Sequence, residues 1–264
     1  MIRVGIGGWT FAPWRGVFYP AGLPQATELQ HASRRLTSIE VNGTFYRTQT
    51  PAVFRTWRDA VPEGFVFSLK APRFATNRRV LAEGGPSIEK FLDSGITELG
   101  EKLGPILWQL PPTKKFDEAD LAGFLALMPR EHKGVRLRHA LEVRHASFLT
   151  PALPPLLREH GVAVVYAHSE DYPEIADPTA DFVYARLQRT AEDQETGYPP
   201  AELDAWADRV REWERGGVPR DLPSLAPPPP ESAPRDCFVY FISGAKVRAP
   251  AAAEALIARL GSAG

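Results

Sequence analysis

The chain has 264 residues, of which 44% are hydrophobic and 24% charged, as in an ordinary globular protein with room for one large core. Its 31 basic and 32 acidic residues nearly cancel, which argues against broad electrostatic capture of nucleic acid or of an anionic membrane and requires any anion site to be built locally. Cys237 is the only cysteine, so no internal disulfide can form, and without a signal sequence or a spanning-length apolar run we expect a cytoplasmic protein with no membrane partner.

Eight segments read as short strands, and most of them are separated by helical patterns. This alternation is typical of a parallel α/β protein, and eight units at this length predict a single (β/α)8 barrel of the TIM type over residues 1–264. The expected strands are 3–8, 37–42, 65–70, 105–110, 140–144, 162–167, 182–187 and 238–243. The expected helices are 27–36, 52–60, 87–99, 117–128, 151–160, 200–215 and 250–260, with Ser87 as an N-terminal cap and Gly161 just after a C-terminus.

Two connections depart from the regular pattern. The segment between the sixth and seventh strands is barely long enough for a crossover helix and contains Pro173 and Pro178, so we expect a short or irregular helix there. Residues 218–234 hold seven prolines, which exclude a regular helix or strand. We expect this stretch to be an extended excursion before the eighth strand.

The stretch LTSIEVNGTFYR, residues 36–47, places a carboxylate on a strand that otherwise reads as buried. Burying Glu40 costs free energy unless the carboxylate is paired or hydrogen-bonded. We therefore expect Glu40 to lie at the mouth of the barrel and to belong to a site.

Other polar residues stand at the carboxyl ends of the expected strands, where barrels of this type build their sites. Period-two alternation puts Glu40 with Asn42, Glu142 with Arg144, and Arg186 with Gln188 on common faces. The predicted catalytic residues are Glu40 and Glu142, and the predicted substrate-binding residues are Trp9, Asn42, Tyr46, Lys70, Gln109, Arg144, His168 and Arg186. A buried glutamate–arginine network that closes the barrel top is the structural alternative.

Two close glutamates could divide acid and base roles, because neighbouring like charges push their pKa values apart. Basic loops after the third and eighth strands favour binding of a phosphate or nucleotide; they carry Lys70, Arg73, Arg78 and Arg79, and Ser243, Gly244, Lys246 and Arg248. Exposed rings such as Tyr46 would stack on a sugar or a base. We predict no metal and no cofactor, since Glu40, Glu142 and His168 lack the spacing of a dedicated metal motif.

At these residues the chain resembles the YecE-like family, also called the domain of unknown function 72 family. The matching pieces are GIGGWTFAPWRGVFYP, SIEVNGTFYR, FVFSLKAPR, GPILWQLPP and LEVRHASF, all within the first 150 or so residues. The resemblance implies a TIM-type barrel without an established reaction. Family-like positions are Trp9, Trp14, Tyr19, Glu40, Asn42, Phe45, Tyr46, Lys70, Gln109, Pro111, Glu142 and Arg144.

The chain departs from the family pattern at several polar positions, namely Asn77, Gln188, Arg189, Ile242 and Ser243. Three functions stay open at this point. The first is an enzyme acting on a small anionic, phosphorylated or nucleotide-like substrate. The second is a nucleic-acid-binding or nuclease-like barrel, by analogy of fold alone. The third is a non-catalytic binding or scaffold protein, favoured by the departures and by the proline-rich excursion.

Overall fold

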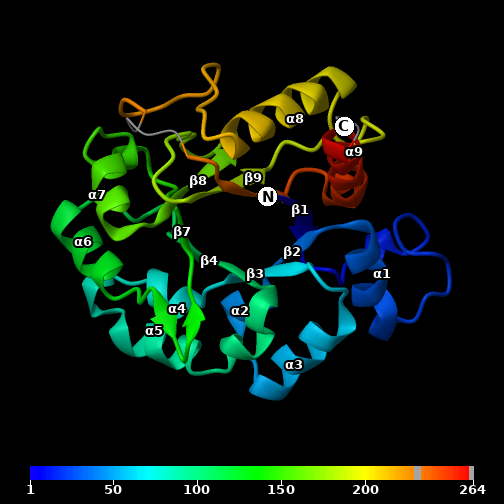
Figure 1. Cartoon of the computed structure of the whole chain (residues 1–264), viewed down its shortest axis with the longest axis horizontal. Helices are drawn as coiled ribbons and strands as arrows, with labels where there is room; N and C mark the ends of the chain where they lie inside the picture. The colour runs from blue at the N-terminus through cyan, green and yellow to red at the C-terminus, as the bar shows by residue number, and fades with distance from the viewer. Residues whose placement is uncertain (229–232, 262–264) are drawn as a thin grey trace.

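Eight parallel strands close into a barrel in the computed structural model, which describes residues 1–228 and 233–261 (Figure 1). Around the barrel the order is β1, β10, β9, β8, β7, β4, β3, β2, and β1 pairs with both β10 and β2. The strands are β1 (Ile2–Gly7), β2 (Ser38–Val41), β3 (Val66–Lys70), β4 (Leu103–Gln109), β7 (His139–Glu142), β8 (Ala163–His168), β9 (Phe182–Leu187) and β10 (Asp236–Phe241). The predicted TIM-type barrel is confirmed, with every strand within two residues of its expected bounds.

Helices surround the strands on the outside of the barrel (Figure 1). The longer ones are α1 (Glu28–Arg35), α3 (Pro51–Ala60), α5 (Gly85–Leu92), α6 (Glu118–Ala126), α7 (Leu153–His160), α8 (Pro200–Glu214) and α9 (Ala249–Gly261). Short helices α2 (Gly43–Tyr46) and α4 (Arg73–Thr76) follow β2 and β3, and β5 (Glu131–His132) pairs with β6 (Val135–Arg136) in a small hairpin. None of the described helices is long and apolar enough to cross a membrane.

The helix expected over residues 87–99 is divided in the structure. It begins at Gly85, so Ser87 lies inside the first turn and does not cap it, which corrects that prediction. It ends at Leu92, and a 3-10 segment, η4 (Ile96–Lys102), follows Gly95, whose φ is 103°. A β-carbon on Gly95 would lie 2.7 Å from Pro51, so the close approach of α3 and the left-handed backbone both require glycine here.

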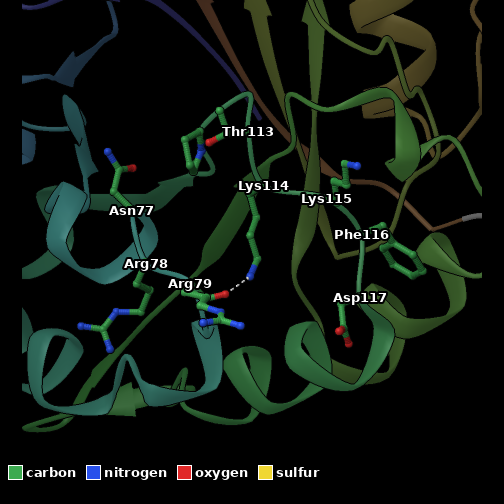
Figure 2. Close-up of a pocket in the computed structure, with 9 residues that line it drawn as sticks. Asn77, Arg78, Arg79, Thr113, Lys114, Lys115, Phe116 and Asp117 are labelled. Carbon is green, nitrogen blue, oxygen red and sulfur yellow. Dashed lines mark hydrogen bonds between the residues drawn. The ribbon is translucent and has the colours of Figure 1, made fainter.

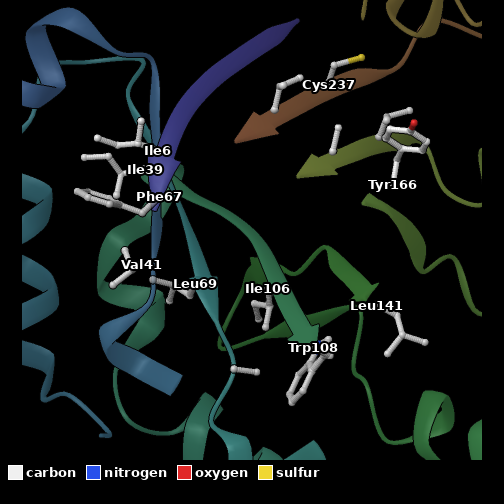
Figure 3. Packing of buried hydrophobic residues seen from close by; sticks show 14 of the residues in the cluster. Ile6, Ile39, Val41, Phe67, Leu69, Ile106, Trp108, Leu141, Tyr166 and Cys237 are labelled. Carbon is white, nitrogen blue, oxygen red and sulfur yellow. The ribbon is translucent and has the colours of Figure 1, made fainter. Parts of the chain in front are cut away.

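The strands are buried on both faces. Outward-facing side chains such as Ile39, Phe67 and Trp108 form the larger apolar cluster beneath the helices (Figure 3). A second, inner cluster of apolar residues, including Val66, Leu107 and Phe238, fills the barrel interior. Parallel strands covered on both sides have this nearly continuous apolar character. Polar residues on the inner face therefore depart from the pattern and require a functional or structural explanation.

The connection from β8 to β9 contains no helix, so the predicted crossover is irregular, as expected, but the expected short helix is absent from this fully described segment. The described part of the proline-rich excursion takes its place. The carboxylate of Asp177 accepts hydrogen bonds from the backbone N–H groups of Leu225 (2.7 Å) and Ala226 (3.0 Å), and Ala176 N–H donates to Pro223 O at 2.8 Å. Residues 229–232 of the excursion lie outside the described residues.

Candidate functional site

The inner face of the barrel carries two carboxylates joined by one guanidinium. Arg186 on β9 reaches both oxygens of Glu40 on β2, from Nε and Nη2, at 3.1 Å each, while its Nη1 donates to Glu142 on β7. All three side chains are buried. Bidentate charge-assisted bonds of this kind are strong and directional. The structure thus brings together the two predicted catalytic glutamates, and it assigns every guanidinium nitrogen of Arg186 to them.

Each glutamate also has a further partner. The Tyr184 hydroxyl donates to Glu40 at 2.7 Å, and Arg144 Nε donates to Glu142 at 2.8 Å. Burial opposes ionisation of Glu142, but Arg186 and Arg144 together lower the pKa of this carboxyl below its ordinary value. Glu142 is therefore a carboxylate at neutral pH, able to accept a proton but poorly suited to donate one.

The polar network extends both inward and toward the mouth. Below the glutamates, the Tyr184 hydroxyl lies 2.8 Å from Ser68 Oγ. Toward the mouth, Arg144 Nη1 donates to the hydroxyl of Tyr172 at 3.3 Å, and its guanidinium lies 4.2 Å from the centre of the Tyr172 ring. Sequence reasoning missed both tyrosines. Tyr184 could have been found by alternation, since it stands two residues before Arg186, whereas Tyr172 lies in an irregular connection that has no periodic signal.

Lys70 ends β3 on the same inner face and is only 7% exposed. Its ammonium lies 4.2 Å from the centre of the Phe45 ring. Burial is the main reason that the pKa of Lys70 is lowered to about 8, and Arg186 adds to this, while Glu40 and Glu142 act in the opposite direction. The cluster thus contains three basic side chains, Arg186, Arg144 and Lys70, and only two acidic ones.

Two glutamines at the mouth have buried polar atoms without a hydrogen-bond partner among the described residues. These atoms are Oε1 of Gln109 on β4 and Nε2 of Gln188, just after β9. An unpaired buried acceptor or donor costs about 1–3 kcal/mol, and such groups are usually satisfied by water or by a bound molecule. One acceptor and one donor are thus available beside the charged cluster.

A cavity of about 450 Å³ opens next to these residues. It lies over the ends of β7, β8, β9 and β10 and is lined by Arg144, Tyr172, Gln188, Arg189, Ser243 and Gly244, among others. Loops after the last two strands are a frequent phosphate site in TIM barrels. Two cations predicted for this region are engaged elsewhere, because Lys246 Nζ lies 4.6 Å from the centre of the Phe11 ring and Arg248 donates to Glu192 O.

The structure does not bring His168, Trp9 and Tyr46 into the charged cluster. His168 faces outward, where its ring lies 5.0 Å from that of Trp206, and burial lowers its pKa to about 4. The Trp9 ring packs against Trp57 at 5.3 Å between centroids. Tyr46 is 67% exposed on α2.

Asn42 follows β2 and is half-buried near the mouth. Its amide nitrogen makes a long hydrogen bond of 3.5 Å to the backbone oxygen of Glu40. Asn42 is therefore placed beside the cluster without being bonded into it.

The predicted basic loop after β3 forms a separate groove with the loop after β4 (Figure 2). Its volume is about 650 Å³, and its cations are Arg78, Arg79, Lys114 and Lys115. Lys114 Nζ is held by Arg79 O and by Asp120, each at 2.6 Å. The Arg78 guanidinium points away from the lysines and bonds backbone oxygens of Phe74 and Glu83. In residues 1–228 and 233–261, no group of three or more His, Cys, Asp and Glu is arranged to hold a metal ion.

The closed parallel barrel and the polar cluster at its carboxyl ends define a TIM-barrel protein with a charged mouth. The family model for a protein of unknown function, DUF72, matches residues 3–264. The chain belongs to the DUF72 family.

Solved structures agree on the fold. A DUF72 family protein from Thermotoga maritima is 21% identical with a TM-score of 0.71, the match covering 97% of each chain. A DUF72 family protein from Enterococcus faecalis is 16% identical with a TM-score of 0.70, covering 100% of this chain and 97% of that one. No curated protein gives a significant match.

Proposed function

We propose that the mouth of the barrel binds a small anionic substrate, phosphorylated or nucleotide-like, and that the chain is an enzyme acting on it. The observation that carries the proposal is the composition of the cluster. Three buried or half-buried cations face only two carboxylates, and those carboxylates are already paired with arginine. An anion is the partner that such a site lacks.

Each group has a separate part in this proposal. Because Arg186 is saturated by the glutamates, the ligand's charge is met by Lys70 and by Arg144, which lines the adjacent cavity. The unpartnered amide groups of Gln109 and Gln188 supply one acceptor and one donor. Glu142 is the candidate general base, since its arginine partners keep it ionised.

The test is titration with inorganic phosphate and with AMP at constant ionic strength, followed by calorimetry. Arg144→Gln should weaken binding about tenfold or more, because it removes a charge-assisted hydrogen bond worth roughly 1.5–3 kcal/mol. Arg136→Gln is the matched control, since Arg136 lies on the exposed hairpin and pairs with Asp181. Equal affinity of the wild type and Arg144→Gln, or no binding of either compound, would remove the proposal.

A second candidate is binding of single-stranded nucleic acid on the groove of Figure 2. A neighbouring pocket shares Asn77 and Arg78 with this groove and adds Phe74, whose side chain is 63% exposed. Cations that follow a backbone beside exposed rings are the usual means of holding single strands. This candidate uses residues that the small-anion site does not use.

Fluorescence anisotropy with a labelled single-stranded oligonucleotide separates the two candidates. The double substitution Arg79→Gln and Lys115→Gln should reduce the slope of log affinity against log salt concentration by about 1–2, since up to two phosphate contacts are lost. Phe74→Ala should weaken the binding free energy by about 1–3 kcal/mol. Arg144→Gln should leave oligonucleotide binding unchanged. Unchanged oligonucleotide binding by the groove variants would exclude this groove as the nucleic-acid site.

A further inference from the structure

Of the three cations in the charged cluster, Lys70 alone has no carboxylate partner among the described residues. No hydrogen bond or ion pair joins its ammonium to another described side chain, and the ammonium lies over the face of the Phe45 ring, 4.2 Å from the ring centre. The two glutamates that face it are held by Arg186 and Arg144. A buried lysine usually recovers its lost hydration in a salt bridge, and here the available carboxylates are already committed.

The surroundings of Lys70 raise the fraction of neutral amine well above that of an ordinary lysine. The charged groups facing it are Arg186, Arg144, Glu40 and Glu142, and the net effect with burial is a pKa of about 8. At a pH of about 7.5, roughly a quarter of Lys70 is free amine, against about 0.1% of an ordinary exposed lysine. Desolvation and a neighbouring cation are the two conditions that turn lysine into a nucleophile toward carbonyl carbon.

We propose that Lys70 forms an imine with a small carbonyl compound that also carries an anionic group. The inference rests on the proposed binding of anions at the mouth, and it names the substrate class as an aldehyde or ketone bearing a carboxylate or phosphate. The lone pair of Nζ attacks the carbonyl carbon and forms the C–N bond. The carbonyl oxygen takes up the two amine protons and leaves as water, and the C=N nitrogen is then protonated from solvent.

The rest of the mouth is suited to this product. The protonated imine keeps the positive charge of the ammonium, so the Phe45 ring can continue to stabilise it. Glu40 and Glu142 stabilise the same charge at longer range, and neither can bond Lys70 without giving up Arg186 or Arg144. Arg144 lines the cavity where the anionic end of the substrate would lie.

The experiment uses glyoxylate, the smallest aldehyde with a carboxylate, together with cyanoborohydride to reduce any imine. Peptide mass mapping then gives the labelling rate of each lysine in the same molecule. At a pH of about 7.5 we expect Lys70 to be labelled at least about tenfold faster than the exposed Lys115, with a rate that reaches half its maximum near a pH of about 8. Lys70 labelling no faster than that of Lys115 would overturn the proposal.

Two variants and a neutral probe separate this inference from the proposed function. Lys70→Arg should abolish the selective adduct, and Lys133→Arg, in the exposed turn between β5 and β6, should leave it unchanged. Glycolaldehyde, which lacks the anionic group, should label Lys70 more slowly than glyoxylate does, and Arg144→Gln should remove that difference. Equal labelling by both aldehydes would keep the imine and remove the anion site, whereas phosphate binding without any Lys70 adduct would keep the anion site and remove the imine.

Discussion

The single side chain that holds the mouth together is Arg186. It is buried, it bonds Glu40 through two nitrogens and Glu142 through the third, and these carboxylates raise its pKa above the ordinary value although burial opposes its charge. Two buried carboxylates would repel each other without it. Arg186 therefore compensates both carboxylates inside the barrel, and it helps to lower the pKa of Glu142.

Arg186→Met should destabilise the fold by about 3–5 kcal/mol at neutral pH, because it leaves two buried carboxylates without their counter-ion. The loss should shrink as the pH falls and Glu142 takes up a proton. Urea denaturation at several pH values measures both effects. Tyr184→Phe is the matched control: it removes one hydrogen bond to Glu40 and should cost about 1–3 kcal/mol. An unchanged free energy of unfolding in Arg186→Met would show that the two glutamates do not depend on Arg186.

For individual residues, the sequence predicted where the charged cluster lies but not all of the side chains in it. Glu40, Lys70, Glu142 and Arg186 were found because alternation sets which strand residues share a face. His168 was misplaced because it shares its parity with Tyr166, which packs on the outer side against Trp206. The end of a strand does not by itself place a side chain inside the barrel, and the inner-facing residues of β8 include Ala163 and Val165.

Between elements, β4 and β7 are joined on their outer face by a buried pair of rings. Trp108 Nε1 donates to His139 Nδ1 at 3.0 Å, so His139 carries its proton on Nε2, which lies 2.8 Å from Pro129 O. Protonating Nδ1 would break the bond from Trp108. Burial lowers the pKa of His139 to about 4.

The sign of the resulting pH dependence follows from this lowered pKa. The folded state keeps His139 neutral while the unfolded chain binds a proton below about 6.5, so stability is complete above that pH and falls with acid down to about 4. The slope is at most about 1.4 kcal/mol per pH unit for one histidine. His168 acts in the same direction, since burial also lowers its pKa to about 4.

His139→Gln should therefore roughly halve the slope of unfolding free energy against pH between about 6.5 and 4.5 without abolishing it. Urea denaturation across this range, followed by tryptophan fluorescence, measures the slope. His145→Gln is the control, because His145 lies in an exposed turn and bonds only Ser147. A slope unchanged by His139→Gln would mean that the histidine is protonated in the folded state.

Sequence patterns predicted the elements well where burial determines the pattern, and poorly where a single contact between distant residues determines the structure. The eight strands are apolar runs covered on both faces, which is a strong signal. The division of the helix expected over 87–99 depends on the contact of Gly95 with Pro51, 44 positions away in the sequence, and no periodicity contains that information. The hairpin of β5 and β6 has strands of two residues each, too short to be recognised.

No helix connects β8 to β9, so the outer face of the barrel at this point must be covered by another segment of the chain. The described part of the proline-rich excursion supplies it, and Asp177 anchors it through the N–H groups of Leu225 and Ala226. Proline-rich chain suits this role because it loses little entropy when it is fixed in an extended form.

Asp177→Ala should cost about 1–3 kcal/mol, because two partly buried backbone donors lose their acceptor. Limited proteolysis should also cut the excursion sooner. Asp171→Ala, in the same connection but lining the cavity at the mouth, is the control and should leave cleavage unchanged. If Asp177→Ala resisted proteolysis as well as the wild type, Asp177 would not be the anchor of the excursion.

Closure of the barrel depends on the seam between β1 and β2, and at one point on this seam no side chain fits. Gly5 pairs with Ser38, and a β-carbon on Gly5 would lie 2.0 Å from the backbone oxygen of Ser38. Gly5→Ala should force the two strands apart and cost at least about 3 kcal/mol, as overpacking against backbone does. Gly43→Ala is the matched control, because a β-carbon there meets nothing within 4 Å and its φ is not positive. Thermal unfolding should separate the two variants, and similar melting temperatures would show that the seam can open without loss of the fold.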